Sequence, residues 1–205
     1  MSVEHLEVLV EEPSMEAFLR TLLPKLQPVV SFQIYSHQGK GDLLQRLAQR
    51  LEGYAHWLPP SWRILVIVDR DDDDCTALKS TLEHLARGTG LVTRTSARGA
   101  PYAIVNRLAI EELEAWYFGD WGAVREVYPR VSPHVPRQAK YRVPDAIAGG
   151  TWEAFERILR KAGYFRTGLR KGEAARLIAA EMDPPFNRSG SFQVFRATLA
   201  EIGAS

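Results

Sequence analysis

The sequence predicts an α/β protein with a mostly parallel sheet flanked by helices. Short runs rich in branched aliphatic residues alternate along the chain with longer stretches whose apolar residues recur at helical spacing. The run ILVIV at 64–68 is apolar at every position, as a central parallel strand covered on both faces requires. Strands and helices that alternate in this way are typical of parallel sheets.

The first half of the chain is predicted to contain three strand–helix units. Strands are predicted at 5–10, 29–35 and 64–68. The first helix is predicted to be capped by Ser14 and to end before Pro24, because proline interrupts the helical hydrogen bonds. Apolar spacing predicts the next two helices at 42–51 and 75–87.

The second half is less regular. Weaker strands are predicted at 90–95 and 102–105, followed by a helix at 106–118 that leaves Glu111, Glu112 and Glu114 on or beside its polar side. Residues 128–150 are rich in Pro, Arg and Gly and indicate an irregular connector, after which helices are predicted at 152–162, 173–182 and 191–202. We expect an α/β domain over 1–127 and, over 128–205, a connector with a helical C-terminal extension that packs on the same core.

Composition narrows the classes of function. The 26 Lys and Arg residues nearly balance 25 Asp and Glu residues, so a nucleic-acid contact must come from a local patch of positive charge. The single Cys75 excludes an internal disulfide and a CxxC zinc site. No segment approaches the roughly 18 to 20 apolar residues of a membrane span. We therefore expect a cytoplasmic protein with no membrane association.

An acidic cluster follows the most apolar strand. Five aspartates lie between positions 69 and 74, interrupted only by Arg70. Adjacent carboxylates repel one another unless water or a cation screens them, and ligands of open α/β sheets collect at the carboxyl ends of strands. Asp69 and Asp71 are the better metal ligands, because alternate residues of an extended chain face the same way, and Asp74 is the better helix cap. The alternative interpretation is a solvated acidic turn.

Glu11 and Glu12 follow the first strand in the same way. If the two strands are neighbours in a parallel sheet, three carboxylates from distant parts of the sequence converge at its edge. Hard oxygen ligands of this kind suit Mg²⁺ or Mn²⁺. Phosphoryl or phosphodiester chemistry is the reaction that such a site serves best.

A glutamate after the first strand and a later Asp-x-Asp after a buried strand resemble the Toprim domain. The sequence is in particular similar to a bacterial Toprim-like family, domain of unknown function 4276, related to OLD-family nucleases. The similar segments are LVEEPSMEAFLR, GKGDLL, VDRDDDDCTALK, NRLAIEELEAWYFGD, YRVPDAIAGGTWEA and NRSGSFQVF. The resemblance covers nearly the whole chain. It implies a Toprim-like, Rossmann-like fold and a nuclease dependent on Mg²⁺ or Mn²⁺, and many Toprim nucleases act in defence against phage or plasmids.

The resemblance also assigns roles to residues. The catalytic and metal-binding glutamate would be Glu11 or Glu12, with Glu12 slightly favoured because Glu16 follows four residues later; the usual Glu-Gly is replaced here by Glu-Glu-Pro. Its acidic partners would be Asp69 and Asp71, with Asp73 as a third ligand. A second metal would use Glu112 or Glu114, for which an ordinary solvated helix face is the alternative. Lys40 would touch a phosphate at a helix N-terminus, or else be an exposed turn lysine.

Four further basic residues are candidates for phosphate or nucleic-acid contact, although such residues are also common on soluble surfaces. They are Arg98, Arg107, Arg142 and Lys171. The implied partners are nucleic acid and, since the chain has no ATPase domain of the kind that OLD enzymes couple to Toprim, a partner ATPase or other defence protein. A homo-oligomer is left open.

Two other functions compete with the nuclease. One is a non-catalytic module of a larger complex that binds metal or nucleic acid. The other, weaker, is a small-molecule phosphohydrolase with an Asp-x-Asp nucleophile, as in haloacid dehalogenases. That motif expects Thr or Ser shortly after the second Asp, where this chain has Asp72, Asp73 and Asp74.

Overall fold

The computed structural model describes residues 2–27, 30–165, 168 and 170–204. Within these residues four strands form one sheet in the order β2-β1-β3-β4, and all neighbouring strands run parallel. The strands are β1 (His5–Val10), β2 (Ser31–Ser36), β3 (Trp62–Asp69) and β4 (Ile104–Ala109). The predicted α/β class with a Rossmann-like parallel sheet is confirmed. The chain moves to β2 on one side of β1 and then to β3 on its other side, so the topological switch point lies between β1 and β3.

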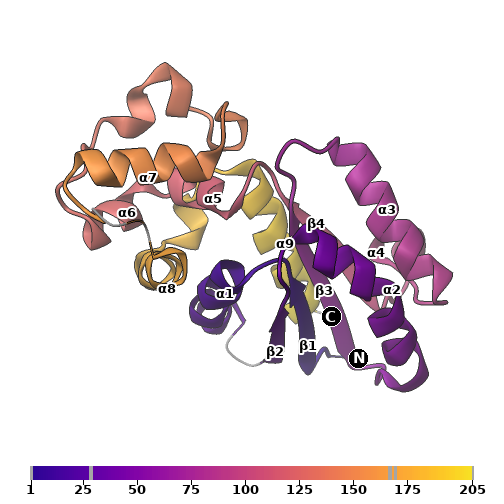
Figure 1. The fold of residues 1–205 in the computed structure, drawn as a ribbon. Coiled ribbons are helices and arrows are strands. Elements are labelled where there is room, and N and C mark those ends of the chain that lie inside the picture. Colours follow the sequence, from indigo (N-terminus) through magenta and orange to yellow (C-terminus); the bar gives the residue numbers. More distant parts are fainter. Residues whose placement is uncertain (1, 28–29, 166–167, 169, 205) are drawn as a thin grey trace.

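Helices cover both faces of the sheet (Figure 1). The helices α1 (Pro13–Leu26) and α9 (Gly190–Ala204) lie on one face, and α2 (Lys40–Trp57) and α3 (Cys75–Gly88) on the other. The fully buried strand β3 contributes to both layers: Leu65 and Ile67 pack toward α1, whereas Ile64, Val66 and Val68 pack toward α2 and α3. This alternation directs Asp69, the last residue of β3, toward the α1 side.

The later part of the chain forms a helical layer beside the sheet (Figure 1). It consists of α5 (Leu113–Gly119), α6 (Trp121–Val127), three short 3₁₀ turns (Val135–Arg137, Ala139–Tyr141 and Pro144–Ala146), α7 (Thr151–Lys161), α8 (Lys171–Glu181) and a 3₁₀ turn at Pro184–Phe186. Aromatic rings join it to the rest. Trp116 stacks on Phe195 with ring centroids 5.1 Å apart, and its ring centroid is 5.7 Å from that of Phe18 in α1. One apolar cluster therefore runs from the sheet into the C-terminal helices.

Two expectations for the first helix are wrong. The helix begins at Pro13 with Glu12, not Ser14, at its N-cap, because proline fits the first helical position, where its missing N–H is not needed. It also continues through Pro24 to Leu26. Other early boundaries shift too: α2 starts at Lys40 and extends to Trp57, well past the predicted end at 51, and residue 29 of the predicted second strand lies outside the described residues.

The segment from 90 to 118 differs most from its prediction. Residues 90–95 form no regular strand; Thr93 makes a single bridge with Ile104, and a short helix α4 (Arg94–Ala97) follows. Residues 106–109 belong to β4 and pair with β3, and the helix predicted from 106 begins only at Leu113. Pairing with a buried neighbour outweighs the local helical spacing here. Glu111 and Glu112 consequently lie in the loop after a strand instead of on a helix.

None of the described helices has both the length and the apolar character needed to span a lipid bilayer.

Candidate metal centre at the carboxyl edge of the sheet

Carboxyl groups from separate parts of the chain meet at the switch point. Glu11 follows β1, and Asp69 ends the adjacent β3. The backbone N–H of Asp69 donates a hydrogen bond to Oε2 of Glu11 over 3.2 Å. β1 and β3 are therefore neighbours, which is the condition under which the sequence predicts that the acids at their ends converge.

Asp69 is the central acid of this cluster. Its side chain is buried, and Oδ1 has no hydrogen-bond partner among the described residues. Burial, followed by the charges of Glu11 and Glu114, raises the pKa of Asp69 well above its usual value. Burial and the charge of Asp71 likewise raise the pKa of Glu11 to about 7. Both groups are held where a cation would relieve their repulsion.

Glu114 joins the same cluster from α5. Of the two interpretations given for Glu114, a metal ligand or part of an ordinary solvated helix face, the solvated face is wrong, because only 2% of the residue is exposed. Burial is the main cause that raises the pKa of Glu114 to about 8; Lys171 opposes it, and Glu112 and Glu12 add to it. The fold turns this residue inward because α5 starts late and packs between the sheet edge and α7.

Tyr117 lies one turn further along α5 and is not among the site residues predicted from the sequence. Its hydroxyl is buried and has no hydrogen-bond partner within the described part of the chain. Burial, then the charges of Glu114 and Asp69, raise the pKa of Tyr117 well above its usual value. Its spacing of three residues from Glu114 places both side chains on one side of a helix. This spacing is the only feature of the sequence that associates Tyr117 with the acidic residues.

Lys40 binds the aspartate loop, a contact that neither of its predicted roles, a phosphate ligand or an exposed turn lysine, included. Gly39 has φ 97°, and Lys40 is the first residue of α2. Its Nζ lies 2.7 Å from Oδ2 of Asp71 and 2.6 Å from Oδ2 of Asp73, and it also donates to the backbone carbonyl of Arg70 at 3.1 Å. Although burial alone lowers the pKa of Lys40, these hydrogen bonds raise it. Asp71 and Asp73 therefore share one lysine as their ion-pair partner.

The loops after β3 and β4 hold each other in place. Asp71, with φ 50°, donates its backbone N–H to the carbonyl of Glu111 over 2.8 Å, and Glu111 itself has φ 64°. Arg70 forms an ion pair with the Glu111 side chain. Asp74 accepts a hydrogen bond from the backbone N–H of Ala77 at 2.7 Å and caps α3, as predicted.

Two helices of the C-terminal part contact the acidic residues: α8 through Lys171, and α7 through its first turn. Nζ of Lys171, at the start of α8, is 3.5 Å from Oε1 of Glu12 and 4.4 Å from the ring centroid of Trp152. Burial lowers the pKa of Lys171, but Glu114 and Glu12 raise it more. Glu112 accepts hydrogen bonds at 2.8 Å from the hydroxyl of Thr151 and the backbone N–H of Trp152, so it caps α7.

The geometry leaves most of these carboxylates paired with protein groups. Within the described ranges no set of three or more His, Cys, Asp or Glu side chains is arranged to hold a metal ion. Instead Glu12 contacts Lys171, Asp71 and Asp73 contact Lys40, and Glu112 caps a helix. The chemistry nevertheless fits a hard divalent cation: the donors are carboxylate oxygens, and the buried Oδ1 of Asp69 has no partner among the described residues.

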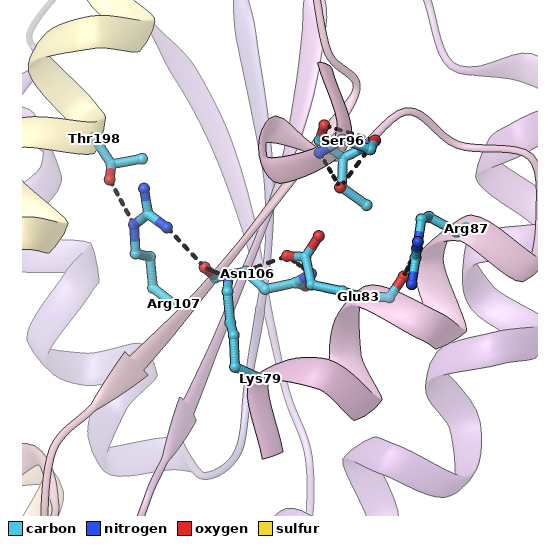
Figure 2. Close-up of polar contacts among 8 residues, drawn as sticks. Lys79, Glu83, Arg87, Ser96, Asn106, Arg107 and Thr198 are labelled. Atoms are coloured by element: carbon cyan, nitrogen blue, oxygen red, sulfur yellow. Dashed lines mark hydrogen bonds and ion pairs between the residues drawn. The ribbon is translucent and has the colours of Figure 1, made fainter. Parts of the chain in front are cut away.

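Arg107 contacts Thr198 and the backbone carbonyl of Asn106 (Figure 2). Its Nε donates to the hydroxyl of Thr198 in α9 at 2.6 Å, and its Nη1 donates to the carbonyl of Asn106 at 2.9 Å. Lys79 of α3 donates to the same carbonyl, and Glu83 accepts from the Asn106 amide at 2.9 Å. These contacts lie along the outer edge of β4, where the half-buried Arg107 links the strand to α9.

The remaining basic candidates are exposed. Arg98, with φ 49°, follows α4 in the segment that enters β4 at its amino end, and Arg142 lies between two 3₁₀ turns. Neither forms an ion pair with the acidic cluster in the part of the chain that the structure describes. Of the four basic candidates, only Lys171 contacts a carboxylate of the site.

Fold and site together define a Rossmann-like α/β protein with buried carboxyl groups at its switch point. Residues 10–200 match the family described as domain of unknown function DUF4276, and the chain belongs to this family, as its sequence segments predicted. A search of solved structures matches the C-terminal region of the OLD protein of Xanthomonas campestris pv. campestris. The match has 16% identity and a TM-score of 0.42, and covers 97% of this chain and 95% of that chain. A search of curated protein sequences finds no match.

Proposed function

We propose that this protein is a nuclease that depends on Mg²⁺ or Mn²⁺ and hydrolyses phosphodiester bonds at the carboxyl edge of its sheet. One observation carries the proposal. Three buried or half-buried carboxyl groups with raised pKa, those of Glu11, Asp69 and Glu114, converge from three separate segments at the switch point. Groups with strongly shifted pKa values that lie close together are typical of functional sites, where a bound ligand interacts with them.

The residues that would hold the cation are Asp69, Glu11 and Glu12. Glu114 is buried beside them, whereas Asp71 and Asp73 are exposed to solvent. A bound Mg²⁺ or Mn²⁺ supplies charge neutralisation at the phosphate and a more acidic water. The protein itself supplies position: β1 pairs with β3 up to Val10 and Ile67, Asp69 pairs with Ala109 of β4, and the N–H of Asp69 donates to Glu11. In the described arrangement Lys40 pairs with Asp71 and Asp73, and Lys171 pairs with Glu12. In a complex with substrate, Lys40 at the first turn of α2 would donate to a phosphate oxygen.

The test is cleavage of nucleic acid by the purified full chain. Plasmid DNA, single-stranded DNA and RNA are incubated with Mn²⁺ or with EDTA. We expect cleavage of at least one substrate with Mn²⁺ only, and a loss of roughly 100-fold or more in Asp69→Asn, because the central ligand is removed. Asp183→Asn, an exposed aspartate outside the site, is the matched control and should cleave normally. Absence of cleavage, or equal cleavage by Asp69→Asn, contradicts the proposal.

A second candidate function is a binding module without catalysis. The ion pairs of Lys40 and Lys171 favour it, because they satisfy carboxylates that a metal would otherwise use. Thermal unfolding with and without Mn²⁺ separates the two functions. A rise in Tm that is lost in Asp69→Asn, together with no cleavage, would assign binding alone.

A further inference from the structure

A basic pocket lies at the far end of α7 from the acidic cluster. It has a volume of about 360 Å³, and its polar lining includes Arg130, Lys140, Arg157 and Lys161. No aspartate or glutamate lines it. The acidic pocket beside the sheet edge, of about 290 Å³, is lined by Asp71, Asp72, Glu111, Glu112 and Glu153 with Gly149 and Gly150.

The four cations of the basic pocket lack carboxylate partners among the described residues, whereas Arg160, on the same helix but outside the pocket, pairs with Glu156 at 3.7 Å. Arg157 and Lys161 lie in the last turns of α7, where they also offset the helix carbonyls. Arg130 and Lys140 come from other segments, so the helix end does not account for the convergence of all four. Like charges brought together around one hollow favour an anion.

Part of the pocket is held in shape. The guanidinium of Arg130 lies 4.1 Å from the ring centroid of Tyr164 and donates to the carbonyl of Gly163 at 3.1 Å. Nζ of Lys140 lies 4.7 Å from the ring centroid of Tyr141, and Tyr141 is buried and stacked on Phe118 at 5.3 Å. Burial raises the pKa of the Tyr141 hydroxyl, but hydrogen bonds with Lys140 and Arg157 lower it more. Positioned arginines and a hydroxyl are suited to phosphate oxygens.

The pocket is connected to the acidic cluster by one rigid element. The first turn of α7 is capped by Glu112, and Arg157 and Lys161 follow six and ten residues after Thr151. At a rise of 1.5 Å per residue, Arg157 lies about 9 Å and Lys161 about 15 Å from Thr151 along the helix axis. This separation corresponds to a few nucleotides of one strand.

We propose that this basic pocket binds a backbone phosphate of the nucleic-acid strand whose scissile phosphodiester lies at the acidic cluster. The proposal rests on the proposed nuclease function and adds where the strand runs: outward from the sheet edge along α7. Contacts to the backbone alone carry no sequence information, so the pocket adds affinity and register instead of base preference.

Binding is measured without cleavage, in EDTA, by fluorescence anisotropy of labelled single-stranded DNA, duplex DNA and RNA. We expect Arg157→Gln and Lys161→Gln each to weaken binding roughly 3- to 10-fold and to reduce the slope of log K against log salt by about 0.7 to 0.9 per lost contact. Arg160→Gln is the matched control and should change the affinity less than about twofold. Equal affinities for wild type, Arg157→Gln and Lys161→Gln, or no binding by the wild type, overturn the proposal.

Two further measurements separate the outcomes. Hydrolysis of bis(p-nitrophenyl) phosphate with Mn²⁺ needs only the acidic cluster, so the pocket variants should hydrolyse it at the wild-type rate. If the pocket variants lose binding and the protein cleaves no substrate, the result supports phosphate binding in the basic pocket and contradicts the proposed nuclease function. Titration with inorganic phosphate and ATP tests whether the pocket instead binds free phosphate or a nucleotide. Loss of ATP binding with unchanged oligonucleotide binding in Arg157→Gln would overturn the proposal.

Discussion

The carboxyl group of Glu114 costs the folded protein stability whenever it is ionised. Its pKa is about 8 in the folded chain, mainly through burial, against an ordinary value of 4.5. The folded state therefore binds this proton more tightly than the unfolded state does. The stabilisation is fully present below the unfolded pKa and is lost as the pH rises through the folded pKa. Asp69 and Glu11 act in the same direction.

We predict that the free energy of unfolding in EDTA falls between pH 5 and pH 9, with Glu114 contributing on the order of a few kcal/mol. Glu114→Gln mimics the protonated side chain, so it should be more stable than wild type at pH 9 and should show a shallower pH slope. Urea unfolding at several pH values measures both. An unchanged slope in Glu114→Gln would show that another group controls the dependence.

At the scale of elements, the sequence predicted the strands and helices whose apolar pattern is strong. Strands β1 and β3, helix α3 and the Asp74 cap could be predicted because their burial and capping residues are local signals. The start of α5 could not be predicted from local signals. Asn106–Ala109 also fit a helical spacing, and only pairing with β3 makes them a strand. That boundary decides where Glu112 and Glu114 lie, so the acidic cluster could be predicted only in part.

Helix α8 packs on α1 through small residues. Ala174, Ala175 and Ala179 are all buried, and the start of this helix carries Lys171 to Glu12. We predict that Ala175→Leu, which forces extra volume between the helices, lowers the free energy of unfolding by about 1 to 3 kcal/mol. Ala180→Leu places the same side chain on the exposed face of α8 and should be nearly neutral. Equal effects of the two substitutions in chemical unfolding would contradict this packing.

At the scale of the whole molecule, one apolar core runs across residue 127, on both sides of the boundary between the predicted α/β domain and the predicted helical extension that packs on the same core. Phe18 of α1, Trp116 of α5 and the ring pair Phe192 and Phe195 of α9 belong to one cluster. No local pattern shows this, because the contacts join segments far apart in the chain.

We predict that a fragment of residues 1–127 does not fold cooperatively, because removal of α8 and α9 exposes the apolar faces of α1 and α5. The full chain should show one unfolding transition by circular dichroism and tryptophan fluorescence. The fragment should bind a dye for exposed apolar surface and show no sharp transition. A fragment that melts cooperatively would establish the N-terminal part as an independent domain.

The position of Lys171 also bears on how the protein is made. Translation delivers Glu12 and Asp69 early, whereas the lysine that contacts Glu12 and the helix that covers α1 leave the ribosome much later. A nascent chain thus has Glu12 without its lysine partner, whereas Lys40 is already present beside Asp71 and Asp73. If the acidic cluster cuts nucleic acid, a chain released before α8 and α9 would lack the lysine that pairs with Glu12 and the helix that covers α1, so the surroundings of the site are completed only late in translation.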